Sequence, residues 1–486
     1  MTTALIVGAG PVGLTIAVEL ARYGVPVRIV DRDAARTGQS RAIVVWPRTI
    51  ELLERAGLAG KFLAAGLKIT HGEILAGAEH LARMDFSEVP SAYRFVLSIP
   101  QSETERLLEE RLAALGVTVE RACELQSFAD EGEAVACTLR RADGATETAR
   151  FDWLIGCDGA RSTVRQTLKL DFHGDTLPEN FVLADIEAAG LTPEELTVIW
   201  SDDGVLLCFP LPGGRHRLIA DVGAEPRHDP SFAEIQAIVA RRAPGVTISD
   251  PVWLSGFAIN ERMVQNYRTG RVFVAGDAAH IHSPAGGQGM NTGMQDAFNL
   301  AWKLALVVDG AAAPALLDSY GPERSGVAKQ ILSDSGRLTR AGLMKGRIEQ
   351  HIRNFAIHVL LGFRVTREKA AARMAELTIR YPDSPLSRGA AHDGPAPGER
   401  IVAGPAFGAG DAPRLALLAA DTPEARAFLR GHAGLVEPAL RPALGDGLIR
   451  LVRPDGYVAA AARPGEWDVI QGCMDAIAGR AGVALS

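Results

Sequence analysis

The first part of the chain alternates short apolar runs with segments of helical period. Ala4–Val7 is an apolar run, Leu14–Arg22 carries apolar residues at helical spacing, and Val25–Val30 is rich in β-branched residues. This order predicts a strand, a helix and a second strand, in other words a βαβ unit. A further helix is expected over Arg48–Ala56, because apolar residues recur there and Gly57 supplies a stop.

Two sheet-like stretches interrupt this α/β pattern. In the first, Tyr93, Phe95 and Leu97 fall on one face of a predicted strand. The second runs from about Phe181 to Phe257 and reads as antiparallel sheet, with a hairpin turn at Gly213-Gly214. The α/β pattern resumes after each stretch, so both sheet segments are predicted to be insertions in one domain.

The resumed α/β segments define the predicted domains. Helices are expected over Glu103–Leu115 and Asn291–Val308, the latter after the strand Val272–Ala275, and a Gly/Pro-rich linker at Gly394–Gly398 precedes a separate block. The expected divisions are an α/β domain with a helical extension at 1–75, 100–178 and 262–390, an inserted β-sheet domain at 76–99 and 179–261, and a C-terminal domain at 395–486.

Composition indicates the class of protein and which binding partners can be excluded. The chain has 486 residues, which favours two or three domains, and its 47% hydrophobic and 22% charged residues are ordinary for a globular protein. A net charge of −7 offers no basic stripe, so nucleic acid is not expected as a partner. The late apolar run Phe355–Phe363 is too short to span a membrane and predicts a buried helix.

The cysteines are Cys123, Cys137, Cys157, Cys208 and Cys473, an odd number without close pairing. Together with an N-terminus that shows no positively charged signal region, they favour a reducing cytoplasm over a disulfide framework. No Cys-x-x-Cys is present, so a redox cysteine pair of that spacing is not available.

A glycine motif follows the first predicted strand. Gly8–Gly13 has the pattern G-x-G-x-x-G and opens the first helix. Gly8 permits a tight turn, Gly10 lets a pyrophosphate approach the helix N-terminus, and Gly13 allows close helix packing. Asp31 ends the next strand, where a carboxylate can bind a ribose. A glycine-rich turn without a ligand is the alternative, and NAD and FAD are equally compatible with this motif.

Two later motifs also follow predicted strands. Asp158–Arg165 contains an acid, a glycine and two arginines, Arg161 and Arg165, after a strand that ends at Ile155. Gly276–His280 follows the strand Val272–Ala275, so that its Asp277 lies at a strand's carboxyl end, where open α/β sheets bind ligands. Three ordered motifs are far more specific than a single glycine pattern.

With these motifs the sequence resembles the para-hydroxybenzoate hydroxylase-like family of single-component FAD-dependent aromatic and polyketide monooxygenases. The resemblance extends over almost the whole chain, through Pro47–Thr49, Gln101 and the segment Ser283–Asn291. It implies a Rossmann-like FAD-binding domain with an inserted antiparallel substrate-binding sheet and a small C-terminal thioredoxin-like domain. The strand–turn–strand pattern of Leu451–Val458 resembles that tail, but the lone Cys473 argues against electron transfer there.

The resemblance also implies which residues hold FAD. The glycine loop would hold the pyrophosphate, Asp31 the ribose, Asp277 the ribityl chain, and the loop after Pro284 the isoalloxazine ring, while the Asp158-Gly159 loop would serve FAD and the nicotinamide cofactor. The full set of expected cofactor residues is Gly8, Gly10, Pro11, Val12, Gly13, Asp31, Arg32, Arg41, Gln101, Leu125, Asp158, Gly159, Gly276, Asp277, Pro284, Gly287, Gly289, Met290 and Asn291.

The segment Gly287–Asn291 has an independent physical rationale. It precedes a predicted helix, whose unpaired N–H groups and positive end stabilise negative charge on a reduced flavin. No second dinucleotide motif is present, so NADPH or NADH is expected to bind transiently at the surface of the FAD domain, with the preference open. FAD is expected to be non-covalent, because no cysteine or histidine has an evident attachment context.

Candidate substrate residues are the aromatics of the inserted sheet, namely Tyr93, Phe95, Trp200 and Phe209. Core packing explains each of them equally well. Arg215–Arg217 near the hairpin reads as a solvated loop, although Arg217 could reach inward.

No catalytic residue is assigned. A base for a phenol could be His71 or a tyrosine, and nothing selects one. His280 and His282 are expected to support the flavin motif by packing, and no histidine cluster has metal spacing.

The predicted function is hydroxylation of a small aromatic substrate, phenolic or polyketide/quinone-like, with NAD(P)H and O2 through a flavin C4a-hydroperoxide. Baeyer–Villiger insertion on the same fold, a flavin-dependent dehydrogenase or reductase, and a non-catalytic ligand-sequestering flavoprotein are the alternatives. Labelled oxygen in the product and ligand-stimulated NAD(P)H consumption would separate them. A homodimer is left open.

Overall fold

The computed structural model describes residues 3–36, 38, 40–77, 79–225, 229–284, 286–344, 349–350, 353–354, 361, 363–391, 393–402, 404 and 406–479. The predicted βαβ unit is confirmed, as β1 (Ala4–Val7), α1 (Pro11–Arg22) and β2 (Val27–Val30). These strands belong to a five-stranded sheet of order β17-β18-β11-β1-β2, completed by β11 (Trp153–Gly156), β18 (Val272–Val274) and β17 (Arg268–Thr269).

The register of this sheet places three strand ends side by side. Val7 of β1 pairs with Gly156 of β11, and Gly156 pairs with Val274 of β18, all in parallel. The strands are completely buried apolar runs, as expected for a parallel sheet covered on both faces. The three sequence motifs therefore begin at one edge of one sheet.

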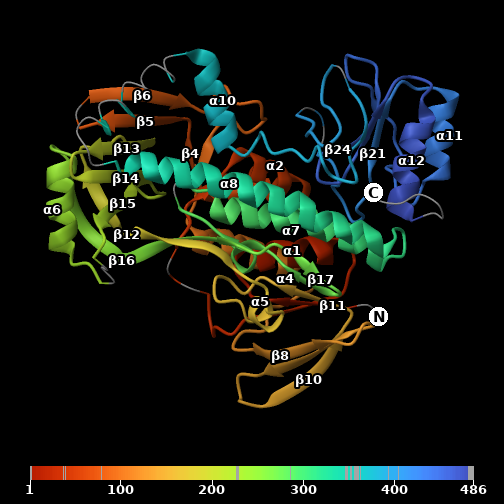
Figure 1. Ribbon diagram of the computed structural model, residues 1–486, viewed down its shortest axis with the longest axis horizontal. Coiled ribbons are helices and arrows are strands. Elements are labelled where there is room, and N and C mark those ends of the chain that lie inside the picture. Colours follow the sequence, from red (N-terminus) through yellow and green to blue (C-terminus); the bar gives the residue numbers. More distant parts are fainter. Residues whose placement is uncertain are drawn as a thin grey trace.

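Two long helices run side by side through the middle of the molecule, α7 (Gly289–Val308) and α8 (Tyr320–Gly342) (Figure 1). Helix α1 packs closely on α7, and Gly293 of α7 permits this approach because an added Cβ would lie 2.7 Å from Val12. The remaining elements of this region are β3 (Val44–Val45), α2 (Pro47–Arg55), α3 (Ala59–Ala65), β4 (Leu67–Ile69), β7 (Val96–Ser98), α4 (Gln101–Ala114), β8 (Glu124–Asp130), β9 (Val135–Arg140), β10 (Thr146–Phe151), α5 (Thr163–Thr167), η1 (Gly276–Ala278), η2 (Pro314–Ser319) and α10 (Arg364–Met374).

The inserted strands form an eight-stranded sheet of order β19-β16-β12-β15-β14-β13-β5-β6. Its members are β5 (His71–Ala76), β6 (Glu79–Asp85), β12 (His173–Ala189), β13 (Glu195–Ser201), β14 (Gly204–Pro210), β15 (Arg215–Gly223), β16 (Thr247–Met263) and β19 (His280–Ile281). Helix α6 (Phe232–Arg242) packs on one face. The predicted hairpin is confirmed between β14 and β15, where Gly213 and Gly214 both have positive φ.

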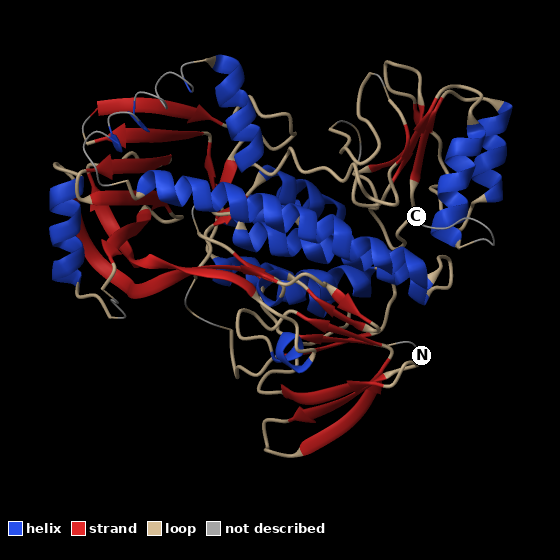
Figure 2. Cartoon of the chain, viewed as in Figure 1, coloured by secondary structure: helices blue, strands red, loops and turns tan. Residues whose placement is uncertain are grey.

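The C-terminal block stands apart as a further α/β unit (Figure 2). Its sheet has the order β20-β24-β23-β21-β22, and α12 packs on it. The elements are β20 (Arg388–Gly389), β21 (Ala416–Ala419), α11 (Pro423–Gly431), β22 (Arg441–Pro442), β23 (Ile449–Val452), β24 (Val458–Ala462) and α12 (Trp467–Ala478).

The expectation of a solvated loop at 215–217 is wrong. These residues belong to β15, and the Arg217 side chain is completely buried. Its guanidinium binds Asp185 at 2.7 Å and the main-chain oxygen of Arg41 at 3.1 Å, so the cost of burying the charge is offset by pairing. Arg217 thus connects the inserted sheet to the loop after β2.

The predicted buried helix at 355–363 lies almost entirely outside the described residues. None of the helices within the described ranges combines the length and the apolar character that crossing a membrane requires.

Candidate functional site

The glycine motif adopts the geometry that a dinucleotide loop needs. Gly8 has φ +100°, and an added Cβ there would collide with the carbonyl of Cys157 on the neighbouring strand; at Gly13 it would collide with the carbonyl of Gly8. At Gly10, by contrast, a Cβ meets no atom of the described residues within 4 Å. The loop is therefore packed tightly behind and open in front, where a pyrophosphate would approach.

Asp31 shapes this loop as well as facing the cavity in front of it. Its Oδ2 accepts a hydrogen bond from the Ala9 N–H at 2.6 Å, and its Oδ1 accepts one from the Asp33 N–H at 2.8 Å. The carboxylate thus joins the end of β2 to the glycine loop. It retains accepting capacity for a ribose hydroxyl, since a carboxylate has about four lone-pair positions.

A cavity of about 340 Å³ lies at this edge of the sheet. Its lining brings together many of the predicted cofactor residues, namely Gly8, Gly10, Asp31, Arg32, Arg41, Gln101, Leu125, Asp158 and Gly159. Thr163 of the Asp158–Arg165 motif also lines it, as do Arg36, Glu105 and Arg121, which sequence reasoning missed. Helical spacing could have found Glu105, because it follows Gln101 by one turn and accepts a hydrogen bond from it at 2.9 Å.

The second motif is held by its own side chains. Asp158 accepts hydrogen bonds from Ser162 Oγ at 2.6 Å and from the Val164 N–H at 3.2 Å. Burial raises the pKa of Asp158, against the effect of these hydrogen bonds. Arg165 donates to the carbonyl of Ala278 at 3.2 Å, so it links the second motif to the third rather than reaching the cavity.

The third motif lies against α1 and α7. Gly276 has φ +59°, and a Cβ there would lie 2.7 Å from Val12 of α1. Asp277 is exposed in the described chain. The loss of hydration among the surrounding protein atoms raises the pKa of its carboxyl, while His280 and Arg41 act to lower it. Pro284, also exposed, accepts a hydrogen bond from the Gly287 N–H at 2.9 Å.

The start of α7 is clamped through its side chains, which leaves its main chain available. Asn291 is fully buried; its Nδ2 donates to the Val44 carbonyl at 2.9 Å and its Oδ1 accepts from the Trp46 N–H at 2.8 Å. The Trp46 indole donates to the Gly286 carbonyl at 3.0 Å. No side chain in the described part of the chain caps this N-terminus, so its free N–H groups and positive end can meet a ligand. The role of Trp46 was not predicted.

Behind this loop lies a completely buried ionic centre. Asp296 of α7 accepts from the Gly276 N–H at 3.0 Å and from Arg324 Nε at 2.6 Å, and it pairs with His280 Nε2 at 2.7 Å. Arg324 and His280 lower the pKa of Asp296 against the opposing effect of burial. His282 stacks on His280, and burial lowers its pKa to about 4. These histidines support the motif from behind.

The predicted substrate aromatics do not gather in one place. Trp200 and Phe209 belong to a hydrophobic cluster on the face of the inserted sheet opposite α6, together with Trp46. Tyr93 and Phe95 contact each other edge to face, with ring centroids 6.2 Å apart, and pack against the core of the nucleotide-binding domain. Met290, at the start of α7, packs against that same core.

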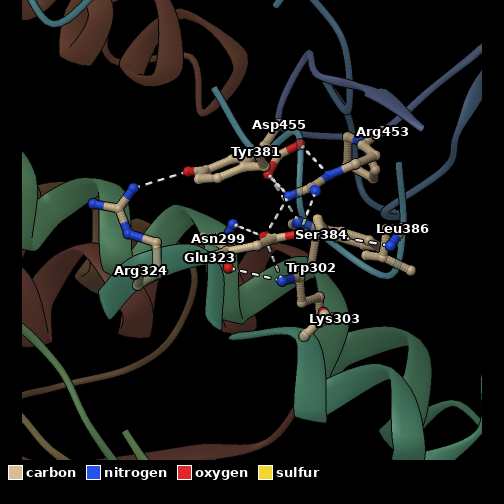
Figure 3. A network of polar contacts seen from close by, with 12 residues as sticks. Asn299, Trp302, Lys303, Glu323, Arg324, Tyr381, Ser384, Leu386, Arg453 and Asp455 are labelled. Carbon is tan, nitrogen blue, oxygen red and sulfur yellow. Dashed lines mark hydrogen bonds and ion pairs between the residues drawn. The ribbon is translucent and has the colours of Figure 1, made fainter. Parts of the chain in front are cut away.

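The C-terminal block is joined to α7 and α8 by buried charges (Figure 3). Glu323 of α8 pairs with Arg453 at 2.7 Å and with Lys303 of α7 at 2.8 Å, and Arg453 also pairs with Asp455 at 2.6 Å. Arg324 donates to the hydroxyl of Tyr381 at 2.8 Å. Within the described residues, no cluster of His, Cys, Asp and Glu side chains could hold a metal ion.

Comparison with known proteins agrees with this geometry. The FAD binding domain family model matches residues 1–335. The 6-methylpretetramide 4-monooxygenase of Streptomyces rimosus is 40% identical over 406 residues, which are 79% of this chain and 71% of that protein. The OxyS anhydrotetracycline hydroxylase of Streptomyces rimosus aligns with a TM-score of 0.82 at 30% identity over 98% of this chain and 99% of that one. CabE, an aromatic hydroxylase from angucycline biosynthesis, aligns with a TM-score of 0.80 at 32% identity over 97% and 98% of the two chains. The chain belongs to the FAD binding domain family and is an FAD-dependent aromatic and polyketide monooxygenase.

Proposed function

We propose that this protein hydroxylates a small phenolic or polyketide-like aromatic molecule, using FAD, NAD(P)H and dioxygen. The observation that carries the proposal is the meeting of three motifs at adjacent strand ends, Val7, Gly156 and Val274, beside the uncapped start of α7. The relatives named for 6-methylpretetramide and anhydrotetracycline favour a polyketide-like substrate.

The residues present fit FAD. The open space before Gly10 and the cavity lined by Asp31 and Arg41 would take the ADP end of the cofactor. Asp277 would bind the ribityl chain, and the main chain from Gly287 to Asn291 would lie beside the isoalloxazine ring. Both Nδ2 hydrogens of Asn291 are donated, to the carbonyls of Val44 and Gly287, and its Oδ1 accepts from the Trp46 N–H, so its side chain holds the loop.

When bound, FAD would accept a hydride from NAD(P)H and activate dioxygen. The protein's own contribution would be to stabilise the negative charge of the reduced flavin ring. The N–H groups at Gly289 and Met290 and the positive end of α7 would face the position where negative charge develops on the ring. Asp296 holds the Gly276 main chain in place from behind.

The inserted sheet would supply the apolar surface for the aromatic substrate. Trp200 and Phe209 lie on its face opposite α6, near Trp46, whose indole holds the loop before α7. We propose these two aromatics as substrate contacts. Tyr93 and Phe95 stay candidates, though their packing in a different cluster favours a structural role. An apolar enclosure excludes water from the reacting atoms.

The proposal includes a transient NADPH or NADH site on the surface of the FAD domain, a cytoplasmic location and room for a homodimer. The described cysteines are free and buried, as suits a reducing compartment. Light scattering would determine the assembly.

Turnover under labelled dioxygen tests the function. Candidate phenols and polycyclic quinones are screened for stimulated NAD(P)H oxidation, and the product is analysed by mass spectrometry. One labelled oxygen atom per product is expected; product structure then separates hydroxylation from Baeyer–Villiger insertion. An oxidised product without label would identify a dehydrogenase, and binding without NAD(P)H consumption would identify a ligand-sequestering protein.

A further inference from the structure

Glu376 has a backbone conformation that favours glycine. It follows α10 and its C-cap Ala375, and its φ of +58° is in the left-handed region. The side chain is also almost completely buried, with 1% of its surface exposed. Both the strained backbone and the buried carboxyl cost stability. A residue that is unfavourable on two counts at once points to a function.

The carboxyl of Glu376 contacts the first turns of α7. Its Oε1 lies 3.1 Å from Thr292 Oγ1, and its Oε2 accepts a hydrogen bond from Gln295 Nε2. The same segment is tethered a second time, because Gln288 Nε2 donates to the Met374 carbonyl at 3.3 Å. Glu376 is therefore bound to the helix whose N-terminus is proposed to face the flavin.

Thr292 has one hydroxyl proton for two acceptors. Its Oγ1 lies 2.9 Å from the Gln288 carbonyl and 3.1 Å from Glu376 Oε1, and a carbonyl can only accept. A proton on the Glu376 carboxyl would allow both contacts to be hydrogen bonds at once. Burial acts in the same direction, raising the pKa of Glu376 to about 8.

The charges around Glu376 come from several elements. Arg324 of α8 favours its ionised form, and Asp296 of α7 opposes ionisation. Arg400 donates to the carbonyl of the next residue, Leu377, at 3.0 Å, and its charge is paired with Glu51. Arg324 forms its ion pair with Asp296. Among the described residues, no cation therefore forms an ion pair with Glu376.

We propose that Glu376 is a positioning residue of the flavin site, which in its protonated form holds the first turns of α7 and keeps that helix end free of negative charge. This inference rests on the proposed function. Ionisation would place a carboxylate beside the first turn of α7, where it opposes the positive helix end that stabilises a reduced flavin. The reduced flavin should therefore become less stable as Glu376 loses its proton.

Two substitutions separate the roles of the proton and the side chain. Glu376→Gln keeps a neutral group that can donate to Thr292, whereas Glu376→Gly removes the link and suits the left-handed backbone, so that it should fold. In the wild-type holoenzyme, the flavin midpoint potential should fall more steeply with pH around pH 8 than in Glu376→Gln. Glu376→Gly should lower the potential at pH 7, and the glutamine variant should restore it.

Infrared spectroscopy reads the proton independently of the flavin. The difference spectrum between wild type and Glu376→Gln should show the carbonyl stretch of a protonated carboxylic acid at pH 7 and lose it above pH 8. Glu195→Gln, at a second acid whose pKa burial raises, controls for the band assignment and should leave the potential unchanged.

Absence of the band at pH 7 would overturn the protonated state. If the band is present but the wild type, Glu376→Gln and Glu376→Gly have identical flavin potentials, the positioning role is overturned and the FAD function stands. A purified protein that does not bind added FAD would instead remove the proposed function, while the infrared result would still report on Glu376.

Discussion

The Arg324 guanidinium donates through Nε to Asp296 Oδ1 at 2.6 Å, and both side chains are completely buried. Because Asp296 also accepts from the Gly276 N–H, this pair fixes α8, α7 and the third motif to one another. The pair therefore lies between the helical core and the loop proposed to hold the ribityl chain.

Arg324→Met should leave the Asp296 carboxylate without its main charge partner. Breaking a buried pair from one side costs about 3–5 kcal/mol, and the loosened Gly276 loop should also bind FAD less tightly. Chemical unfolding and fluorescence titration of the apoprotein with FAD measure the two effects. Lys303→Met is the matched control, since Lys303 and Glu323 pair between the same helices without contacting the loop. The hypothesis fails if both variants weaken FAD binding equally.

Gly10→Ala and Gly13→Ala should give opposite phenotypes. The Cβ at Gly10 enters open space before the glycine loop, whereas at Gly13 it would collide with the Gly8 carbonyl. As an apoprotein, Gly10→Ala is expected to fold with an unchanged melting temperature, but it should not bind FAD; the Gly13→Ala apoprotein is expected to lose stability by about 1–3 kcal/mol. Circular dichroism melts and flavin content after gel filtration would reveal the contrast. A normally loaded Gly10→Ala protein would contradict the assignment of the pyrophosphate.

His282 should make the protein less stable in acid. Burial lowers its pKa from 6.5 to about 4, so the unfolded chain binds a proton that the native state refuses between these values. Stability contributed by the neutral imidazole is complete above pH 6.5 and is lost as the pH falls toward 4, by up to about 3 kcal/mol. His282→Gln should flatten this part of the stability profile, measured by urea unfolding at a series of pH values. An unchanged slope would show that His282 does not titrate in this way.

Cys473→Ser should leave turnover and flavin content unchanged. The thiol is buried, and burial raises its pKa to about 12, so almost no thiolate is present to react. Steady-state kinetics and flavin absorbance provide the measurement. Loss of activity in a folded, flavin-loaded variant would show that the C-terminal block takes part in electron transfer after all.

Local patterns predicted the framework of the site well. The G-x-G-x-x-G loop, the strand before Asp158 and the strand before Gly276 each depend on neighbouring residues, and parallel pairing then brings their ends together. The cavity lined by Asp31, Arg41 and Gln101 follows from that arrangement.

The supporting contacts could not be read in the same way, because they join residues far apart in sequence. Arg217 binds the main-chain oxygen of Arg41 across 176 positions, and Trp46 binds Asn291 across 245. Near a hairpin glycine pair, three polar residues are most simply read as a solvated loop; the burial of Arg217 is explained by its distant partners, Asp185 and the Arg41 carbonyl. Glu376 could not be recognised from the sequence, because its proposed role depends on its left-handed backbone and on its contacts with α7.

The buried charges that join the C-terminal block to the central helices also constrain the order of folding during synthesis. Glu323 emerges from the ribosome 130 residues before its partner Arg453. Until Arg453 has been synthesised, Glu323 of α8 lacks one of its cationic partners. Helices α7 and α8 also lack the C-terminal block against which they pack. The packing of α7 and α8 should therefore be completed only after Arg453 has emerged and paired with Glu323.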